Sequence, residues 1–366
     1  MTMEARERAN ELKAMAANLP HGPSQVALLE EAVQLADSVN DIDLAYELRE
    51  ELMTAAVFSG RENILFVAFS WCVATFDRNP GRFQSHGLLW RYKWVISHLI
   101  DYPAISRARL DELMVDMERR YRDAGSTMYA HFHLQRKLYE RLGERQLAKS
   151  AHARFGKCRR DDLSDCEACV ASSNCDYHSF QGQWSRAVKA AQPVLDGRLR
   201  CTEQPHVTLS TVLQPLLRLG RLEEAKQYQR QSYALIRGDS TFIQQHAEQM
   251  EFLALIGDLS KAKSIFERHS PAGCRCANAD DRFHFFMSAR LWTERLLMRK
   301  THRLKIRLPE GLPKPDASGK TDVRVLGDWF LSQAQEIAQQ FDSRNGTGDY
   351  QRRIDGHPEL MRLAID

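Results

Sequence analysis

Long apolar runs, a strong charge of one sign and densely spaced cysteines are all missing from this sequence of 366 residues. No window approaches the roughly 18 uncharged apolar residues that a membrane-spanning helix needs, so we expect no membrane segment. The N-terminal stretch MTMEARERANELKAMAANLP is charged and amphipathic, which argues against a signal peptide. Eight cysteines are too few for a disulfide scaffold in a chain of this length. We therefore expect free thiols and a cytoplasmic protein.

Glycine and proline are also scarce, with 19 and 12 residues, and most of them stand where helices would end. No run of alternating apolar and polar residues is long enough to predict a sheet. Hydrophobic residues make up 43% and charged residues 27%, which is typical of a soluble globular chain with a sizeable core. The net charge of +3 is too small to indicate nucleic-acid binding. The fold class predicted is all-α.

One pattern recurs at a nearly constant interval: glycine, any residue, a bulky apolar residue, two residues of any kind, alanine. It occurs at Gly182 (GQWSRA), Gly220 (GRLEEA) and Gly257 (GDLSKA), and a weaker copy at Gly143 has Arg145 in place of the apolar residue. Successive glycines are 39, 38 and 37 residues apart. The glycine suits a left-handed helix end, and the alanine lets two helices approach closely. A fixed period of this size is typical of helical repeat proteins.

This pattern resembles the tetratricopeptide repeat family across residues 126–270. Ala262 followed by Phe266 fits the A-x3-F element of that family, and Ala225 has Tyr228 one place early. The period is longer than the usual 34 residues and most copies lack the terminal proline, so HEAT-like repeats remain an alternative. The resemblance implies a right-handed α-solenoid of stacked antiparallel helix pairs with a period of about 37–42 residues.

The 3.6-residue periodicity predicts paired helices along most of the chain. The predicted pairs are 4–18 with 24–39, 41–58 with 61–79, 82–101 with 104–124, 126–142 with 144–156, 164–181 with 183–196, 205–219 with 221–236, and 241–256 with 258–270. A longer helix follows at 279–300, and Pro215 should kink or break its own helix. We expect weakly repetitive pairs in 1–125, tetratricopeptide-like repeats in 126–307, a linker at 308–322, and a capping helix with a tail in 323–366.

A cysteine-rich stretch, CRRDDLSDCEACVASSNCDYH, raises the question of a metal site. Cys158, Cys166, Cys169 and Cys175 offer four soft ligands, and a C-x2-C pair suits tetrahedral zinc. However, the pair opens a predicted helix, and Cys175 should face away from Cys166. Cysteine is also one of the most frequently buried residue types. Packed free thiols are therefore the favoured interpretation, and no metal is expected.

Catalytic signatures are not found. The sequence has no H-E-x-x-H, no P-loop, no G-x-S-x-G and no dinucleotide-binding fingerprint. We therefore expect a protein without catalytic residues or a cofactor.

A basic run spans residues 294–307. Its cations are Arg295, Arg299, Lys300, Arg303, Lys305 and Arg307. Cations at the end of the helix at 279–300 complement its dipole, and such a run commonly forms a solvated face. It also supports an alternative hypothesis, a nucleic-acid-associated helical repeat protein.

The resemblance further implies a concave groove lined by the first helix of each pair. Carried onto this sequence, the groove-facing positions are His133, Lys137, Glu140, Asp176, Ser179, Ser210, Gln214, Gln244 and Glu251. Polar residues at these positions suit either a peptide-binding surface or a wetted helix face. The preferred hypothesis is a non-enzymatic scaffold that binds a protein or peptide partner in this groove. An adaptor, a regulator and a defence- or immunity-associated partner all fit.

Overall fold

The computed structural model describes residues 2–365, and the chain divides into two compact units. Unit 1 comprises the described residues up to Leu99 together with Arg109–Leu134 and Arg154–Ser164. Unit 2 comprises Ile100–Ala108, Gln135–Ala153 and the described residues from Asp165 onward. These units interleave along the chain, and the functional division at residues 125, 307 and 322 stays a prediction.

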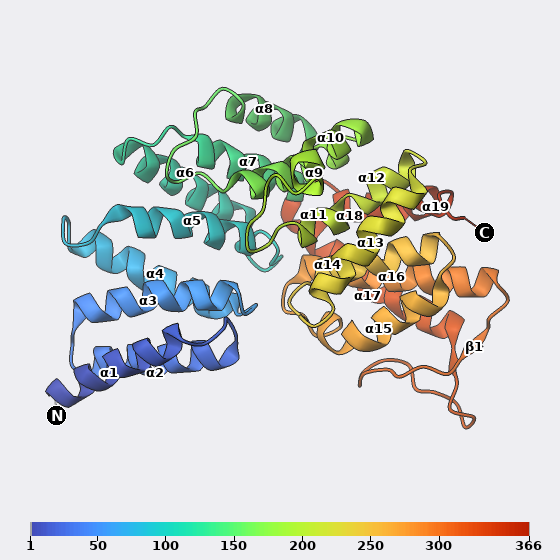
Figure 1. Ribbon diagram of the computed structural model, residues 1–366, viewed down its shortest axis with the longest axis horizontal. Helices are drawn as coiled ribbons and strands as arrows, with labels where there is room; N and C mark the ends of the chain where they lie inside the picture. The colour runs from blue at the N-terminus through green and yellow to red at the C-terminus, as the bar shows by residue number, and fades with distance from the viewer. Residues whose placement is uncertain (1, 366) are drawn as a thin grey trace. The chain divides into compact units, whose positions relative to one another are not determined.

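Unit 1 is built from helices that pack in chain order (Figure 1). They are α1 (Thr2–Ala17), α2 (Pro23–Ser38), α3 (Ile42–Val57), α4 (Glu62–Arg78), α5 (Ser85–Leu99) and most of α6 (Arg107–Asp123). Each helix from α1 to α5 contacts the next one along the chain. Leu12, Leu29 and Leu48 are fully buried between them. The core of this unit is therefore made by successive helices.

Besides residues 100–108, unit 2 contains the C-terminal part of α7 (Tyr129–Arg141), most of α8 and the later helices. These are α8 (Arg145–Phe155), α9 (Glu167–Phe180), α10 (Trp184–Leu195), α11 (His206–Thr211), α12 (Leu213–Arg218), α13 (Leu222–Ile236), α14 (Ile243–Leu255), α15 (Leu259–Gly273), α16 (Ala279–Met298), α17 (Val323–Asn345), α18 (Asp349–Asp355) and α19 (His357–Met361). Neighbours in sequence pair again, as α9 with α10 and α14 with α15. The all-helical architecture of sequential pairs is confirmed, and most boundaries fall within a few residues of those predicted.

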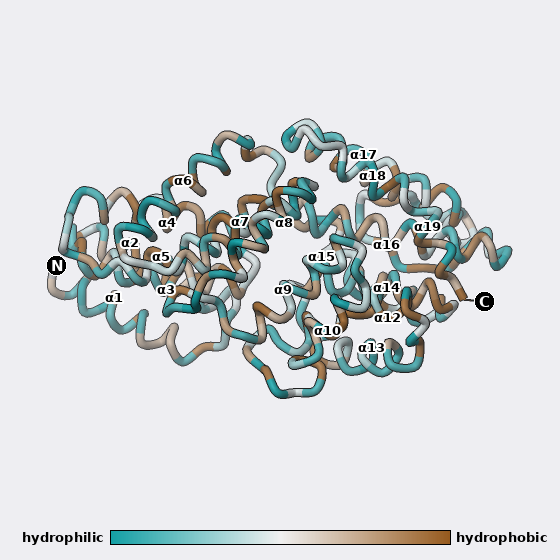
Figure 2. Tube along the Cα trace, turned by 90° about the horizontal axis from the view of Figure 1, so that it is seen from above, coloured by the Kyte–Doolittle hydropathy of each residue, from teal (hydrophilic) through white to brown (hydrophobic). Residues whose placement is uncertain are grey.

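The residues of the repeated pattern behave as the sequence predicted. The four glycines that end the first helices have φ between 72° and 79°, a left-handed conformation that costs glycine little. Ala187, Ala225 and Ala262, which follow them by five residues, are fully buried. A larger side chain at these alanines would separate the two helices of the pair. Figure 2 shows polar and apolar residues interleaved along the helices, as expected when one face is buried and the other is solvated.

Aspartate and asparagine side chains start several helices in both units. Asp41 accepts a hydrogen bond from Leu44 N at the start of α3, and Asp258 accepts one from Lys261 N at the start of α15. Asn278 caps α16 in the same way, and Asp322 accepts from two backbone amides at the start of α17. Each cap satisfies an amide that the helix itself leaves unpaired.

The break expected from Pro215 is found: the helix predicted at 205–219 is split at Val212 into α11 and α12, because Pro215 has no amide hydrogen with which to continue the helical ladder. The structure differs from the sequence prediction in two other places. Two-residue strands β1 (Arg303–Leu304) and β2 (Thr321–Asp322) pair antiparallel, although no strand was predicted. They close the predicted linker into a loop. The predicted tail forms α18 and α19, which are separate short helices.

The helix predicted after the linker is α17, and it packs on α16 as expected. Leu326, Phe330 and Phe341 of α17 are buried in the core of unit 2 with Phe286 and Trp292 of α16. No helix within residues 2–365 has the length and apolar composition needed to cross a membrane.

Candidate functional site

The first helices of the pairs in unit 2 lie side by side. Helix α9 contacts α11, α11 contacts α14, and α14 contacts α16. The Arg136 guanidinium of α7 donates to Asn174 Oδ1 of α9 at 2.6 Å and to the Ser173 carbonyl at 3.0 Å. Because Arg136 is fully buried, these bonds fix α7 against α9. The four contacts join the first helices into one continuous layer.

Most of the predicted groove residues that belong to unit 2 are accessible on this layer. Lys137, Glu140, Ser179, Gln214, Gln244 and Glu251 are half-buried, and Asp176 is exposed. We call these seven residues, together with Glu248, the first-helix face. Glu248 was not predicted, although it lies one helical turn after Gln244 and three residues before Glu251, a spacing that places it on the same side of α14.

Two predicted groove residues are buried and are not available to a partner. Ser210 exchanges a 2.7 Å hydrogen bond with Ser232 and accepts one of 2.8 Å from Gln249 Nε2. His133 belongs to unit 1, where its ring stacks on Phe155 with centroids 5.0 Å apart. Both side chains occupy packed positions because α11 and α7 are covered on more than one side.

Three carboxylates of the first-helix face have no cationic partner. Among residues 2–365, no lysine or arginine forms an ion pair with Asp176, Glu248 or Glu251. Burial raises the pKa of all three carboxyls, to about 7 for Glu251. The pKa of Glu248 is raised further by the negative charges of Asp176, Glu251 and Asp281. Glu248 Oε1 accepts from Gln244, whereas its buried Oε2 has no hydrogen-bond partner.

Asp176 is the exposed carboxylate of the first-helix face. Desolvation by the surrounding protein is the main cause of its raised pKa, and Arg141, Lys137 and Arg136 act in the opposite direction. The negative charge of Asp176 is therefore only partly balanced by neighbouring cations.

Glu140 is the one carboxylate of the face with a direct partner. Its Oε1 lies 3.0 Å from Nε of the buried Arg136, which is one turn earlier on α7. Burial nevertheless raises the pKa of Glu140 to about 7, against the opposing effect of Arg136. This glutamate can therefore exchange a proton with solvent near neutral pH.

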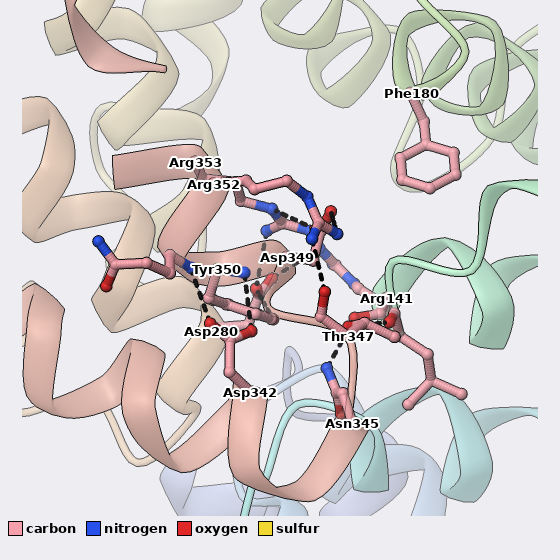
Figure 3. Close-up of polar contacts among 12 residues, drawn as sticks. Arg141, Phe180, Asp280, Asp342, Asn345, Thr347, Asp349, Tyr350, Arg352 and Arg353 are labelled. Carbon is pink, nitrogen blue, oxygen red and sulfur yellow. Dashed lines mark hydrogen bonds and ion pairs between the residues drawn. The ribbon is translucent and has the colours of Figure 1, made fainter. Parts of the chain in front are cut away.

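A second polar cluster lies around Asp280, at the start of α16 (Figure 3). The fully buried Asp280 carboxylate lies 2.6 Å from Nη1 of Arg141 and accepts a 2.5 Å hydrogen bond from the Tyr350 hydroxyl. Arg353 and His284 lie 3.7 Å from its oxygens. Burial alone would raise the pKa of Asp280, but Arg141, His284 and Arg353 together hold it well below the ordinary value. Asp280 therefore stays ionised in its buried position.

The same cluster anchors the C-terminal segment of unit 2. The Thr347 hydroxyl donates to the Leu142 carbonyl at 2.7 Å, and Asn345 Nδ2 donates to the Arg141 carbonyl at 3.4 Å. Asp349 pairs with Arg353 at 3.0 Å and packs directly against Gly143. The turn between α7 and α8 is thus held by residues some 200 positions later. Because every group has partners, this cluster suits a structural role.

The prediction of a basic face in residues 294–307 is partly wrong. Arg295 is buried, with Nε donating to the Ala254 carbonyl at 3.2 Å and Nη2 donating to the Ile365 carbonyl at 2.9 Å. It satisfies a carbonyl near the C-terminus of α14 and cannot meet a ligand. Arg299, Lys300, Arg303, Lys305 and Arg307 are exposed, and Arg303 is paired with Asp316.

The predicted cysteine set is not brought together. Cys175 is buried in the core of unit 2, and Cys158 belongs to unit 1. Cys166 and Cys169 instead approach Cys201, which the sequence analysis did not consider. The sulfur atoms of these three residues lie within 4.8 Å of one another, so they could hold a metal ion. A C-x-E sequence at Cys201–Glu203 was the available signal.

Comparison with known proteins finds no match that would explain this geometry. No protein-family model matches the chain, and no curated protein matches it. The fold and the site define an all-helical protein of sequential helix pairs with a polar, acidic first-helix face.

Proposed function

We propose that this protein is a non-enzymatic scaffold of the tetratricopeptide-like kind, whose first-helix face binds a cationic segment of a partner protein. The observation that carries the proposal is the group of unpaired carboxylates, Asp176, Glu248 and Glu251. The glycine–alanine pattern and the sequential helix pairs support a stacked, solenoid-like arrangement in unit 2. An adaptor, a regulator and a defence-associated partner remain the biological roles that fit.

Within residues 2–365, Asp176, Glu248 and Glu251 have no paired cation, and the two glutamates are half-buried. Removing a carboxylate from water is costly unless a cation or hydrogen-bond donors replace the lost hydration. Glu248 Oε2 lacks such a donor among the described residues. A lysine or arginine side chain from a partner would supply both the charge and the donors. In the free protein burial favours the protonated form of these carboxyls, and a bound cationic segment would stabilise the ionised form.

The layout of the face favours an extended segment over a single small ligand. Asp176 lies on α9, while Glu248 and Glu251 lie one turn apart on α14. Gln214 and Gln244 add amide donors and acceptors on the same face. Amide side chains can bond the backbone of a bound peptide, while the carboxylates select its basic side chains.

Peptide binding tests this proposal directly. Three fluorescent 12-residue peptides of matched length would be used: one rich in lysine, one rich in glutamate and one neutral. We expect the wild-type protein to bind the lysine-rich peptide in a salt-sensitive manner. The double variant Asp176→Asn, Glu251→Gln should weaken that binding by about tenfold or more, measured by fluorescence anisotropy.

The matched control is Glu223→Gln, a neutral substitution on the exposed side of α13. It should leave the affinity unchanged. If wild type does not distinguish the lysine-rich peptide from the glutamate-rich one, or if the control loses as much affinity as the double variant, the proposal is wrong.

The alternative function, nucleic-acid association, rests on the exposed cations Lys300, Lys305 and Arg307. Phosphate contacts of this kind give affinity that falls steeply with salt. A triple change of these residues to glutamate should abolish binding of a fluorescent oligonucleotide. Oligonucleotide binding that survives the triple change would remove the basis for this alternative.

A further inference from the structure

We infer that Cys166, Cys169, Cys201 and Glu203 form a zinc-binding site in unit 2. The Sγ atoms of Cys169 and Cys201 are 3.5 Å apart, and all three sulfur atoms lie within 4.8 Å of one another. Glu203 Oε2 lies 3.8 Å from Cys169 Sγ. In a tetrahedral zinc site with thiolate ligands, neighbouring sulfur atoms are about 3.8 Å apart. The three sulfur atoms therefore lie close enough to share one ion, and Glu203, beside Cys169, is the nearest carboxylate for the fourth position.

Two segments that are far apart in the sequence create this spacing. Cys166 is the N-cap of α9, and its sulfur accepts a 3.4 Å hydrogen bond from Cys169 N in the first turn. Both sulfur atoms therefore face the same side of the helix start. In the sequence analysis, the position of the C-x2-C pair at a helix start was a reason against zinc. In the structure, the same position aligns the two sulfur atoms.

The second segment is a tight turn before α11. Cys201 N donates to the Gln204 carbonyl and Gln204 N donates to the Cys201 carbonyl, both at 3.3 Å. The buried Gln204 side chain accepts from Thr208 and so fixes the turn to α11. Cys201 also packs against the small apolar cluster of Ala168 and Ala171 on α9 and Val194 on α10. The turn thus holds Cys201 and Glu203 over the start of α9.

Three thiols and a carboxylate in one cluster form a donor set that suits a divalent cation. On binding, the ion holds thiolates and carboxylate together, and the thiol protons pass to solvent. Thiolate sulfur selects a soft or borderline ion, for which zinc is the common choice. Cys166 is exposed, which leaves a path for the ion to enter.

The consequence for the protein is local stability. The ion would tie the 201–204 turn to the start of α9, which otherwise meet through a small apolar contact. This inference does not depend on the proposed function, because none of the four ligands belongs to the first-helix face.

Metal content and cobalt spectroscopy test the site. Full-length protein would be purified in reductant, exposed to Zn²⁺, dialysed and analysed for metal. We expect about one zinc ion per chain in the wild type and in Cys274→Ser, a half-buried thiol outside the cluster, and almost none in Cys201→Ser. Co²⁺ in place of zinc should give the intense visible absorption of tetrahedral thiolate coordination, and zinc should raise the midpoint of thermal unfolding.

A second pair of variants guards against misfolding of Cys201→Ser. Cys166→Ser and Glu203→Gln change exposed side chains, and each should weaken Zn²⁺ affinity by about tenfold or more. Wild type that stays metal-free in reductant overturns the inference. So do equal metal contents in Cys201→Ser and Cys274→Ser, or a Cys169–Cys201 disulfide in isolated protein that takes up no metal after reduction.

Discussion

Gly143 meets two structural demands with one residue. Its φ of 73° lies in the left-handed region, and a Cβ atom there would overlap the Asp349 side chain. Gly220 has nearly the same φ, 72°, but nothing lies within 4 Å of the position a Cβ would take. The two glycines therefore separate a backbone requirement from a packing requirement.

Alanine at these two positions should give different losses of stability. We expect Gly220→Ala to lower the free energy of unfolding by about 1 kcal/mol, because only the backbone is strained. Gly143→Ala should cost about 1–3 kcal/mol more, because Asp349 must also move. Urea unfolding measures both. Equal losses for the two variants would mean that the contact with Asp349 carries no energy.

Among single residues, the sequence was most informative where a backbone rule applied. The glycines and alanines of the repeated pattern adopt the conformation and burial expected of them. Arg295 was misassigned, because its charge suggested a surface residue while its guanidinium satisfies carbonyls that only the folded chain brings near. Ser210 was misassigned for the same kind of reason.

Asp280 joins α16 and α18 to the C-terminal end of α7. A buried ion pair contributes little when intact, but the loss of one partner leaves the other charge uncompensated. Asp280 has Arg141 and Arg353 as partners, together with the Tyr350 hydroxyl. The docking of these elements should therefore be sensitive to this one carboxylate.

Asp280→Asn should lower the free energy of unfolding at pH 7 by about 3–5 kcal/mol. Its folded-state pKa is depressed, so the contribution of Asp280 is present above the unfolded value of about 3.9 and is lost as the pH falls through the acid range. The difference between wild type and variant should accordingly shrink in acid, as followed by denaturant unfolding at several pH values.

Asp328→Asn serves as the control, since Asp328 is an exposed carboxylate on α17. It should change stability by no more than about 0.5 kcal/mol. An Asp280→Asn protein as stable as this control would show that the cluster does not hold the elements together.

Among whole elements, periodicity predicted nearly all helices because most of them bury one face. Pro215 was recognised as a breaker, although the split falls at Val212 and not at the proline itself. Strands β1 and β2 could not be predicted, since two residues carry no periodic signal.

For the molecule as a whole, the carboxylates of the first-helix face should make the stability of the protein depend on pH. The pKa of Glu251 is raised to about 7 by burial, and Arg218 opposes the shift. Because the folded-state pKa lies above the unfolded one, the associated stability is present below about pH 4.5 and is lost as the pH rises towards 7. Glu140 acts in the same direction, with Arg136, Lys137, Arg141 and Asp176 as its charged neighbours.

Glu251→Gln should therefore stabilise the protein at pH 8 by about 1–3 kcal/mol and have little effect at pH 5. Thermal unfolding at the two pH values measures this. Glu223→Gln, an exposed residue paired with Lys226, should give no such gain. A Glu251→Gln protein that is less stable than wild type at pH 8 would contradict the view that this charge is uncompensated.

Local rules in the amino-acid sequence were sufficient for the helix pairs and the repeated glycine–alanine pattern. These depend on spacings of three to five residues, which the chain displays directly. The thiol–carboxylate cluster of Cys166, Cys169, Cys201 and Glu203, the buried Asp280 network and the unpaired state of Glu248 depended on folding. The residues concerned are separated by up to hundreds of positions along the chain. Only tertiary packing sets which side chains meet and which remain without a partner.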